Sequence, residues 1–375
     1  MMGAECNQGR TEVAAQVLVD EIADRHVKAE RFTAQMLAGE PARGPVEVAE
    51  RLLAIQGQDP RGARLAIRAR TAGLTAADVD RALTEHRSLV ISWLNRGTLH
   101  LVRTEDYWWL HSLLVRPQLQ AAVGRRMSQI GLSASDADKG VAAVEAALAS
   151  NGPLTRSQLG EVIASAGLPS EDNTPMHVIA LASMRGVAVR GPVIGAQHAY
   201  VHVPDWLGKP PRALDLDVAL AELARRYLSG HGPASDRDLA KWSGLPLGQV
   251  RRGLTAIAPE LRDRPDGLAE LAAAVPAEHL PSPRLLGAFD PVLLGWADRA
   301  PIVGKYQQIV TVNGLFRPFA LVDGRAAATW SWSARQVVLS RFTELPEHVE
   351  AALTAEARDV QRFFEANRPG QVEQQ

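Results

Sequence analysis

Two glutamines, Gln56 and Gln58, stand one residue apart in the segment LLAIQGQDPRGARLAIRAR, which covers residues 52–70. An amide cannot act as a true general base, but its carbonyl oxygen can hold a water molecule and stabilise a developing cation. Asp59 is the competing acidic candidate, although a residue before a helix-opening proline is more often a cap for that helix.

The two glutamines can share a site only where the helix that carries them is broken. Apolar spacing predicts a helix that runs in from Val46, Gly57 weakens it, and Pro60 biases the residue before it away from the helical region. On a continuous helix, side chains two residues apart diverge by about 200°. At a corner between two helices, both can face one cleft. Spacing alone leaves a second explanation open, in which the glutamines cap helix ends or bond the backbone of the turn.

Positive charge is concentrated in one part of the chain. Residues 51–126 contain twelve arginines, no lysine and six acidic residues, a net +6, whereas the whole chain carries −1. This balance excludes a uniformly basic coat, so any contact with nucleic acid must come from a local patch. We expect Arg61, Arg64 and Arg68, at i, i+3 and i+7 of the second helix, to bind DNA phosphates. A solvated arginine-rich face is the alternative.

Several classes of function lack sequence support. The single cysteine, Cys6, cannot form an internal disulfide, a zinc cluster or an iron–sulfur site, so we expect no metal. The sequence contains neither a phosphate-binding loop nor a dinucleotide fingerprint, so we expect no nucleotide cofactor. No apolar run approaches the ~20 residues of a membrane span, and the N-terminus lacks the pattern of a signal peptide. We therefore expect a cytoplasmic protein with no membrane contact.

A weak internal repeat organises the middle of the chain. Residues 152–159 read GPLTRSQL and residues 232–239 read GPASDRDL. In each copy a hydroxyl residue, Thr155 or Ser235, has a polar partner three positions later, which is typical of a helix N-terminus. A third Gly-Pro, beginning at Gly44, opens another run with helical spacing. The repeat predicts helical pairs that recur along the chain.

Hairpins are predicted after these helical pairs. LVISWLNRGTLHLV (residues 89–102) reads as two strands that turn at residues 95–97, and VAVRG and HAYVHV follow the first repeat copy. Helix, turn, helix and hairpin is the order of a winged helix. The alternative is a set of unrelated helical pairs. We predict three winged-helix modules, at residues 1–125, 126–210 and 211–278.

The last hundred residues differ from the rest. Short β-type runs predict a β-rich region at residues 279–375, either a meander or a small barrel, and Asp323-Gly324 is a strong signal for a two-residue hairpin turn. An amphipathic helix then closes the chain. Its expected core-facing residues are Val349, Leu353, Val360 and Phe364. The fold class is therefore predicted as α+β.

Five segments together carry a specific family resemblance. They are LLAIQGQD (52–59), ISWLNRGTLHLV (91–102), EDYWWL (105–110), LLGAFDPVLLGWADR (285–299) and LFRPFALVDG (315–324). With them, the chain resembles the AlkZ-like family of bacterial DNA glycosylases, built on tandem winged helices. The family's catalytic signature is Gln, an apolar residue, then Gln or Asp. Gln56 and Gln58 match the Gln–Gln form, which is associated with self-resistance to DNA-alkylating natural products, and Gly57 stands where an apolar side chain is expected.

The resemblance implies a monofunctional glycosylase that hydrolyses the N-glycosidic bond of bulky N-alkylated purines of the N7-alkylguanine type, with interstrand crosslinks in the same range. Such a base is already cationic and leaves neutral, so the enzyme must stabilise an oxocarbenium-like sugar and position a water. We expect double-stranded DNA that carries alkylated purines as the partner, a monomer, and no cofactor. The rival interpretations are a non-catalytic winged-helix DNA-binding regulator or drug-sequestering protein, and a scaffold with a decayed site.

DNA contacts are expected from two hairpins. In the family, a β-hairpin near the C-terminus reaches into the minor groove beside the lesion, and residues 297–314 are predicted to form it between two β runs. A solvated loop is the alternative. The expected DNA-binding residues of this segment are Arg299, Lys305, Tyr306, Gln307 and Gln308. The hairpin at residues 89–102 adds Arg96 and His100.

Overall fold

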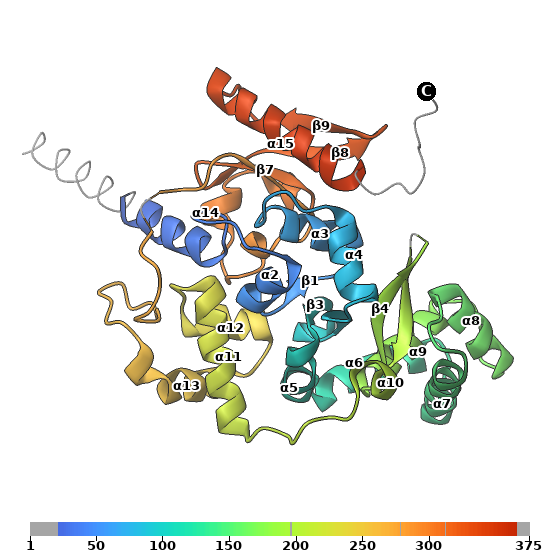
Figure 1. Cartoon of the computed structure of the whole chain (residues 1–375). Coiled ribbons are helices and arrows are strands. Elements are labelled where there is room, and N and C mark those ends of the chain that lie inside the picture. The colour runs from blue at the N-terminus through green and yellow to red at the C-terminus, as the bar shows by residue number, and fades with distance from the viewer. Residues whose placement is uncertain (1–21, 196, 278, 312, 366–375) are drawn as a thin grey trace, which may run out of the picture.

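Helices predominate in the part of the chain that the computed structural model describes, which is residues 22–195, 197–277, 279–311 and 313–365. Two sheets, one of five strands and one of four, lie among the helices (Figure 1). The predicted α+β class is therefore confirmed. Cys6 lies outside the described residues.

The first region carries the glutamines. Residues 22–34 are helical, and the elements that follow alternate helices with short strands. They are α2 (Pro45–Leu52), β1 (Ile55–Gln56), α3 (Pro60–Arg68), α4 (Ala76–Thr84), β2 (Leu89–Trp93), the 3₁₀ turn η1 (Asn95–Gly97), β3 (Leu99–Arg103) and α5 (Thr104–Leu114). The predicted hairpin with its turn at residues 95–97 is confirmed.

Two further regions repeat a run of three helices. Thr155 caps the second helix of one run and Ser235 that of the other, each in a reciprocal capping box, so both predicted helix starts are confirmed. The elements are α6 (Pro117–Gln129), α7 (Ala134–Asn151), α8 (Arg156–Ser165), α9 (Thr174–Met184), β4 (Ala188–Ile194), β5 (Gln197–His202), α10 (Val203–Leu207), α11 (Leu216–His231), α12 (Asp236–Ser243), α13 (Leu247–Ala256) and η2 (Ala258–Glu260).

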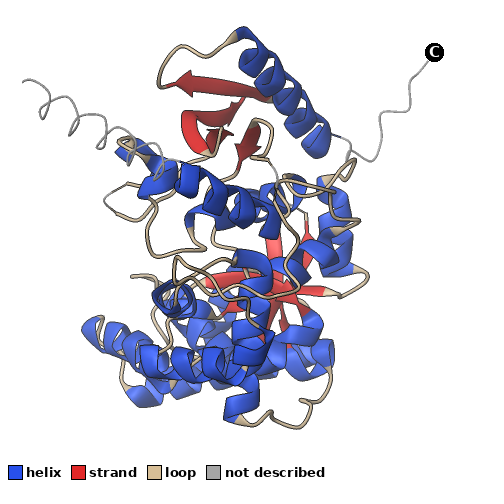
Figure 2. Cartoon of the chain, turned by 90° about the vertical axis from the view of Figure 1, so that its left-hand side faces the viewer, coloured by secondary structure: helices blue, strands red, loops and turns tan. Residues whose placement is uncertain are grey.

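One five-stranded sheet joins the first two regions. Its order is β1-β3-β2-β4-β5, and β2 pairs antiparallel with β4 through Ile91 and Arg190. The two hairpins therefore share one sheet, whose strands lie among the helices in the turned view of Figure 2. The sequence of either hairpin alone does not predict this pairing, because it joins residues far apart in the chain.

The helix predicted to run up to the glutamines ends earlier. After α2, Leu53 adopts a left-handed φ of 62°, and Ile55 and Gln56 form β1. The predicted corner between two helices is therefore wrong in detail, because a strand separates them. Ile55 is fully buried and pairs with Leu101 of β3. The edge of β3 satisfies backbone groups that a helix end would leave without partners.

The C-terminal region contains the second sheet. Its strands are β6 (Arg284–Leu286), β7 (Phe319–Val322), β8 (Arg325–Ser333) and β9 (Gln336–Arg341), paired in that order. Asp323 and Gly324, with φ of 47° and 72°, form the predicted turn between β7 and β8. β7, β8 and β9 form a meander, so of the two predicted forms the structure has the meander rather than a closed barrel.

The segment predicted as a C-terminal hairpin has a different structure. Among the described residues of 297–314, the regular elements are the short helix α14 (Ala300–Val303) and the 3₁₀ turn η4 (Gln307–Ile309). The prediction of two strands here is wrong. Ile302 and Ile309 are buried, and Pro301 lies in the first turn of α14, where proline is well tolerated. Just before this segment lies the 3₁₀ turn η3 (Pro291–Leu293).

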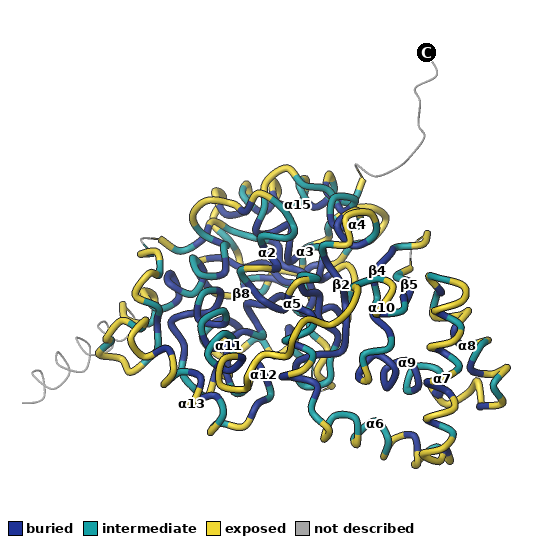
Figure 3. The backbone as a smooth tube through the Cα atoms, turned by 60° about the horizontal axis from the view of Figure 1, so that its bottom comes forward, coloured by how far each residue is buried: buried dark blue, intermediate teal, exposed yellow. Residues whose placement is uncertain are grey.

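The final helix, α15 (Glu347–Glu365), covers one face of the second sheet. Val349, Leu353 and Val360 are buried as predicted. Phe363 rather than Phe364 is the buried aromatic of this helix. In Figure 3 buried segments concentrate around α2, α3 and β2, whereas α7 and α8 show exposed residues along their outer faces. The glutamine strand β1 is itself buried and pairs with the largely buried strand β3.

Candidate active site

Strand β1 places both glutamines on one side of the sheet edge. Gln56 pairs with His100 of β3, and the backbone N–H of Gly57 donates to the carbonyl of Leu99 at 2.7 Å. Side chains alternate along an extended chain, so residues two apart point the same way. Gln56 and Gln58 therefore share one side, as the hypothesis of a broken helix required, although a strand rather than a corner brings this about.

The two glutamine side chains are bonded to each other. Nε2 of Gln56 donates to Oε1 of Gln58 at 2.7 Å. Gln56 is only 5% exposed, whereas Gln58 is exposed. Behind Gln56, the hydroxyl of Thr98 lies 3.4 Å from Oε1 of Gln56 and 3.0 Å from the carbonyl of Asn95. A buried amide thus orients an exposed one, and the exposed one faces solvent.

Gly57 fits the close packing of β1 against the hairpin. A Cβ at this position would lie 3.1 Å from Cγ2 of Ile91 and 3.5 Å from the backbone nitrogen of Leu101. A larger side chain would have to displace Ile91 or move β1 away from β3. The glycine therefore permits the short strand that holds the glutamines, in the place where the family signature has an apolar residue.

Asp59 is a cap rather than a free carboxylate. It is the N-cap of α3, and its Oδ1 accepts a hydrogen bond from the backbone N–H of Arg61 at 2.9 Å. The cap interpretation is confirmed. The carboxylate next to the glutamines therefore already has a structural task at the start of α3.

His100 is buried on β3, directly opposite Gln56. It is 3% exposed, and Nδ1 lies 3.0 Å from the carbonyl of Thr98, to which a neutral ring can donate. Burial, together with the positive charge of Arg96, lowers the pKa of His100 to about 3. The ring is therefore neutral at physiological pH. The prediction that His100 contacts a DNA phosphate is wrong for this structure, because the ring is not at the surface.

The arginines of α3 are not equally free. Arg68 is 4% exposed and bonds Glu356 and Asp359 of α15 at 2.7 and 2.8 Å. Arg64 bonds Asp80 of α4, with Nε at 2.8 Å. The prediction that Arg68 contacts a phosphate is wrong, because its side chain is buried in ion pairs within the fold. For Arg64, which is partly buried and paired with Asp80, phosphate contact stays a prediction. Arg61, in the first turn of α3, is exposed.

Most arginines of residues 51–126 make contacts with other parts of the molecule. Nine of the twelve arginines bond carboxylates or backbone carbonyls, or lie over an aromatic ring. They are Arg51, Arg64, Arg68, Arg70, Arg81, Arg87, Arg96, Arg103 and Arg116. The net charge of a stretch of sequence therefore does not show which of its arginines are free to bind a ligand.

Arg96 docks the hairpin turn on α12. Its Nη1 donates to the carbonyl of Lys241 at 2.9 Å and also to the carbonyl of Trp242. Asn95 donates to the same Trp242 carbonyl at 3.3 Å. Burial and the charge of Arg299 lower the pKa of Arg96. The turn is thus held at the C-terminal end of α12, close to a second guanidinium.

The predicted DNA-binding residues of the C-terminal segment are mostly exposed. Lys305, Gln307 and Gln308 are exposed, and the ring of Tyr306 stacks on Phe342 with centroids 4.1 Å apart. Tyr306 is therefore half-buried, and its ring face is already occupied. The segment presents one cation and two amides to solvent although it is not a β-hairpin.

Arg299, at the start of that segment, is half-buried. Its Nε donates to the carbonyl of Leu293 at 2.6 Å, and its guanidinium lies 5.1 Å from the ring centroid of Phe316. Burial lowers the pKa of Arg299, and the nearby charge of Asp298 opposes that shift. Asp298 itself caps the backbone N–H of Ala300 at 2.9 Å.

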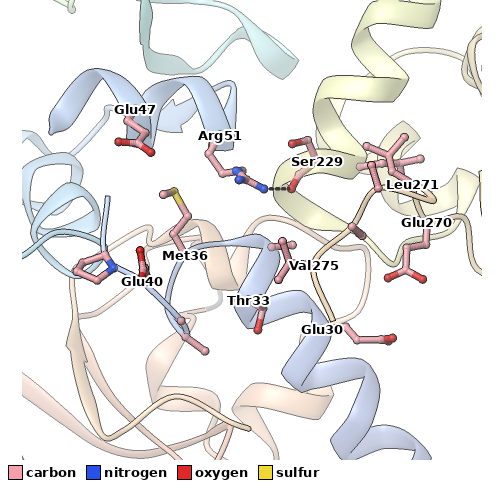
Figure 4. A pocket seen from close by; sticks show the side chains of 18 of the residues that line it. Glu30, Thr33, Met36, Glu40, Glu47, Arg51, Ser229, Glu270, Leu271 and Val275 are labelled. Carbon is pink, nitrogen blue, oxygen red and sulfur yellow. Dashed lines mark hydrogen bonds between the residues drawn. The ribbon is translucent and has the colours of Figure 1, made fainter. Parts of the chain in front are cut away.

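A cavity of about 620 Å³ lies away from the glutamines. Figure 4 shows it between the helix at residues 22–34, α2, α11 and the loop at residues 270–275, where Arg51 donates to the carbonyl of Ser229 at 3.3 Å. Neither Gln56 nor Gln58 lines this cavity. It is therefore not the place where the two amides could act on a substrate.

Within the described ranges, no group of three or more metal-binding His, Cys, Asp or Glu side chains occurs. No helix in the described part of the chain has the length and apolar character needed to cross a membrane. The polar groups of the glutamine site are amides, a hydroxyl and an imidazole.

Comparison with known proteins gives consistent matches over most of the chain. A family model described as "DNA glycosylase AlkZ-like" matches residues 49–363. A relative from Streptomyces sahachiroi, named an interstrand DNA cross-link repair glycosylase, is 26% identical over 371 residues, covering 90% of this chain and 95% of the relative. The solved structure of Streptomyces sahachiroi DNA glycosylase AlkZ is similar in fold, with a TM-score of 0.70 at 23% identity over 90% of this chain and 96% of that chain.

Proposed function

Because this chain belongs to the AlkZ-like family of DNA glycosylases, we propose that it hydrolyses the N-glycosidic bond of bulky N-alkylated purines in duplex DNA. One observation supports this above the others: the bonded pair in which buried Gln56 orients exposed Gln58 at 2.7 Å. The family match covers the segment that carries this pair. The substrate is of the N7-alkylguanine type, whose base departs as a neutral leaving group.

The reaction needs a held water and a stabilised cation rather than a strong base. Oε1 of Gln58 accepts one hydrogen bond from Gln56 and has a second lone pair for a water molecule. Its negative dipole also favours the oxocarbenium-like sugar that forms as the base leaves. Gln56 is too buried to reach a sugar, so in this proposal it positions Gln58.

The proposed enzyme is monofunctional. A bifunctional glycosylase would need an amine that attacks the sugar and forms a Schiff base. The groups bonded to the glutamines are the other amide and the hydroxyl of Thr98. The product is therefore an abasic site in an unbroken strand.

Gln58 lies at an exposed strand edge rather than in an enclosed pocket. A bulky or crosslinked base is difficult to swing into a closed cavity, so an open site suits such adducts. The relative from Streptomyces sahachiroi is named for interstrand crosslinks. By extension, we propose that this chain also releases crosslinked purines and serves self-resistance to a DNA-alkylating natural product.

The repeated helices and hairpins would bind the duplex as three winged-helix modules. The first has the order α2, β1, α3, α4 and hairpin β2–β3, and the second has α7, α8, α9 and hairpin β4–β5. The third, with α11, α12 and α13, has among its described residues isolated bridges where the others have a hairpin. In this proposal a monomer binds DNA through exposed side chains, among them Arg61, Lys305, Gln307 and Gln308.

The test is base release from a duplex that contains a single N7-methylguanine, in the presence of a chelator. We expect an abasic site that becomes a strand break only after alkali or heat. The Gln56→Ala/Gln58→Ala double variant should bind the duplex but release base far more slowly. A wild-type protein that binds alkylated duplexes and releases no base from any of them would favour the DNA-binding regulator instead.

A further inference from the structure

We propose that Arg96 and Arg299 together form a binding site for one backbone phosphate of the DNA, next to the glutamine pair. This inference rests on the proposed function, because that function supplies the duplex. It goes further by assigning two residues from distant parts of the chain to a single anion. Neither residue belongs to a strand or to a long helix; Arg96 lies in the turn η1 and Arg299 precedes α14.

Helix α12 anchors both the turn that carries Arg96 and the backbone just before Arg299. Near its start, Oδ1 of Asp238 accepts from the backbone N–H of Ala297 at 2.9 Å, two residues before Arg299. Near its end, the carbonyls of Lys241 and Trp242 accept from Arg96. These anchor points are three to four residues apart, which is about 5 Å along a helix at 1.5 Å per residue. The Arg96 guanidinium and the backbone two residues before Arg299 are therefore tied to the same helical turn.

The two charges have no acidic partner of their own. Among the described residues, neither Arg96 nor Arg299 forms an ion pair with a carboxylate, and the only acidic influence on either is that of Asp298 on Arg299. Most other arginines of the first region are neutralised within the fold, as Arg68 is by Glu356. Burial lowers the pKa of both arginines, and the charge of Arg299 lowers that of Arg96 further, so a bound phosphate would stabilise both charged forms.

Each guanidinium keeps donors for a ligand. Arg299 uses Nε for the carbonyl of Leu293, and Arg96 uses Nη1 for the end of α12. Within the part of the chain that the structure describes, the remaining N–H groups of both side chains have no hydrogen-bond partner. A guanidinium with a free edge can hold two phosphate oxygens at once.

The site lies beside the proposed reaction. Arg96 is two residues from Thr98, whose hydroxyl contacts Gln56, and its charge acts on His100, which pairs with Gln56. A phosphate held there belongs to the lesion nucleotide or to its immediate neighbour. The pair would thereby fix the sugar of that nucleotide relative to Gln58.

The experiment replaces single phosphates of an N7-methylguanine duplex, one at a time, by uncharged methylphosphonates, and measures binding to the wild-type protein and to Arg299→Gln. At one phosphate beside the lesion, the replacement should weaken wild-type binding by about tenfold, the scale of a charged hydrogen bond. The same replacement should not change binding by Arg299→Gln, because that variant no longer uses the charge of this phosphate. In Arg299→Gln, the slope of log affinity against log salt concentration should also be smaller by about one.

The matched control is Arg125→Gln, which changes an exposed arginine on α6. Each methylphosphonate should weaken binding by this variant as much as it weakens binding by the wild type. Arg96→Gln should give the same pattern as Arg299→Gln if one phosphate serves both. If the methylphosphonates weaken binding equally in the wild type, Arg96→Gln and Arg299→Gln, the inference is overturned. Base release by the wild type from the unmodified duplex is measured in parallel, so that loss of this site is separable from failure of the proposed activity.

Discussion

The first and second regions of the molecule build the same junction with different lengths of chain. In the second, Leu154 bridges to Tyr200 of β5, and the next residue, Thr155, caps α8. In the first, Ile55 pairs with Leu101 of β3, but three residues separate it from the cap of α3. Those three residues are the Gln-Gly-Gln segment. The residues proposed to carry the chemistry thus form an extension of an otherwise repeated scaffold.

The third region supports the same comparison. Ala234 bridges to Ala269, and the next residue, Ser235, caps α12. Two of the three junctions therefore proceed directly from the pairing residue to the helix cap. The extension in the first region is tolerated because Gln56 and Gly57 continue the pairing with β3 instead of leaving backbone groups buried without partners.

The largest effect should come from removing the exposed amide of this extension. Gln58→Ala should slow base release by roughly 10²–10³-fold, the usual loss when one positioned electrostatic contact is removed, while DNA affinity changes little. Single-turnover kinetics at saturating protein measures this. The control is Gln197→Ala, an exposed glutamine of the second hairpin, which should release base at the wild-type rate. If Gln58→Ala releases base at the wild-type rate, the extension has a structural role rather than a catalytic one.

Gln58→Asp sharpens the same comparison. A carboxylate can deprotonate the water and stabilise the cation with a full charge, so we expect activity to survive and to extend to less activated adducts. The measurement is base release from N7-methylguanine and N3-methyladenine duplexes side by side. An inactive Gln58→Asp beside an active Gln58→Ala would place the water elsewhere.

The next effect concerns a histidine in each hairpin. Burial, with a nearby arginine, lowers the pKa of both His100 and His198 to about 3, whereas an unfolded histidine titrates near 6.5. Between these values the unfolded chain binds a proton that the folded chain does not. Stability should therefore fall as pH drops below about 6.5, by up to ~1.4 kcal/mol per pH unit for each histidine, and should level off above it.

Urea unfolding at pH 5 and pH 7.5 measures this slope. His100→Asn and His198→Asn should each reduce the number of protons bound on unfolding by about one. Because the folded His100 is neutral over this range, the rate of base release per folded molecule should stay flat between pH 6 and pH 8. A rate that falls with a midpoint near 6.5 would mean that His100 titrates in the active protein.

A smaller effect is expected from the glycine between the glutamines. In Gly57→Ala, the new Cβ meets Cγ2 of Ile91 at 3.1 Å, and such overpacking typically costs about 1–3 kcal/mol. Ile91→Ala removes that methyl group, so the double variant should recover part of the loss attributable to Gly57→Ala. Chemical unfolding of the single and double variants gives the coupling. Independent, additive effects would show that Gly57 is not there to fit Ile91.

The smallest effects should come from the helix caps, which the regions have in common. Thr155→Ala and Asp59→Ala should each cost ~1 kcal/mol of stability, with Asp59→Asn close to the wild type because asparagine caps equally well. None of these variants should change the rate of base release per folded molecule. A slow but stable Asp59→Asn would identify Asp59 as a catalytic group and would move the chemistry from the extension to the cap.

Local patterns predicted the helix starts and the tight turns well. The capping boxes at Thr155 and Ser235 and the turn at Asp323-Gly324 depend on residues within four positions of each other. The segment at residues 297–314 misled the same reasoning, because its apolar residues occur in a short run that suits either a strand or a 3₁₀ turn. Only contact with the rest of the core distinguishes the two.

The sequence by itself determined the glutamine motif, the caps, the hairpin turns and the family, because these are set by residue types at short spacing. The tertiary structure decided which charges are free. Arg68 is neutralised by Glu356, 288 positions away, and Arg70 by Asp290, 220 positions away. Coulomb energy depends on distance in space and on burial rather than on separation along the chain. No charge count over a window of sequence could therefore distinguish Arg68, inside the fold, from Arg61 at the surface.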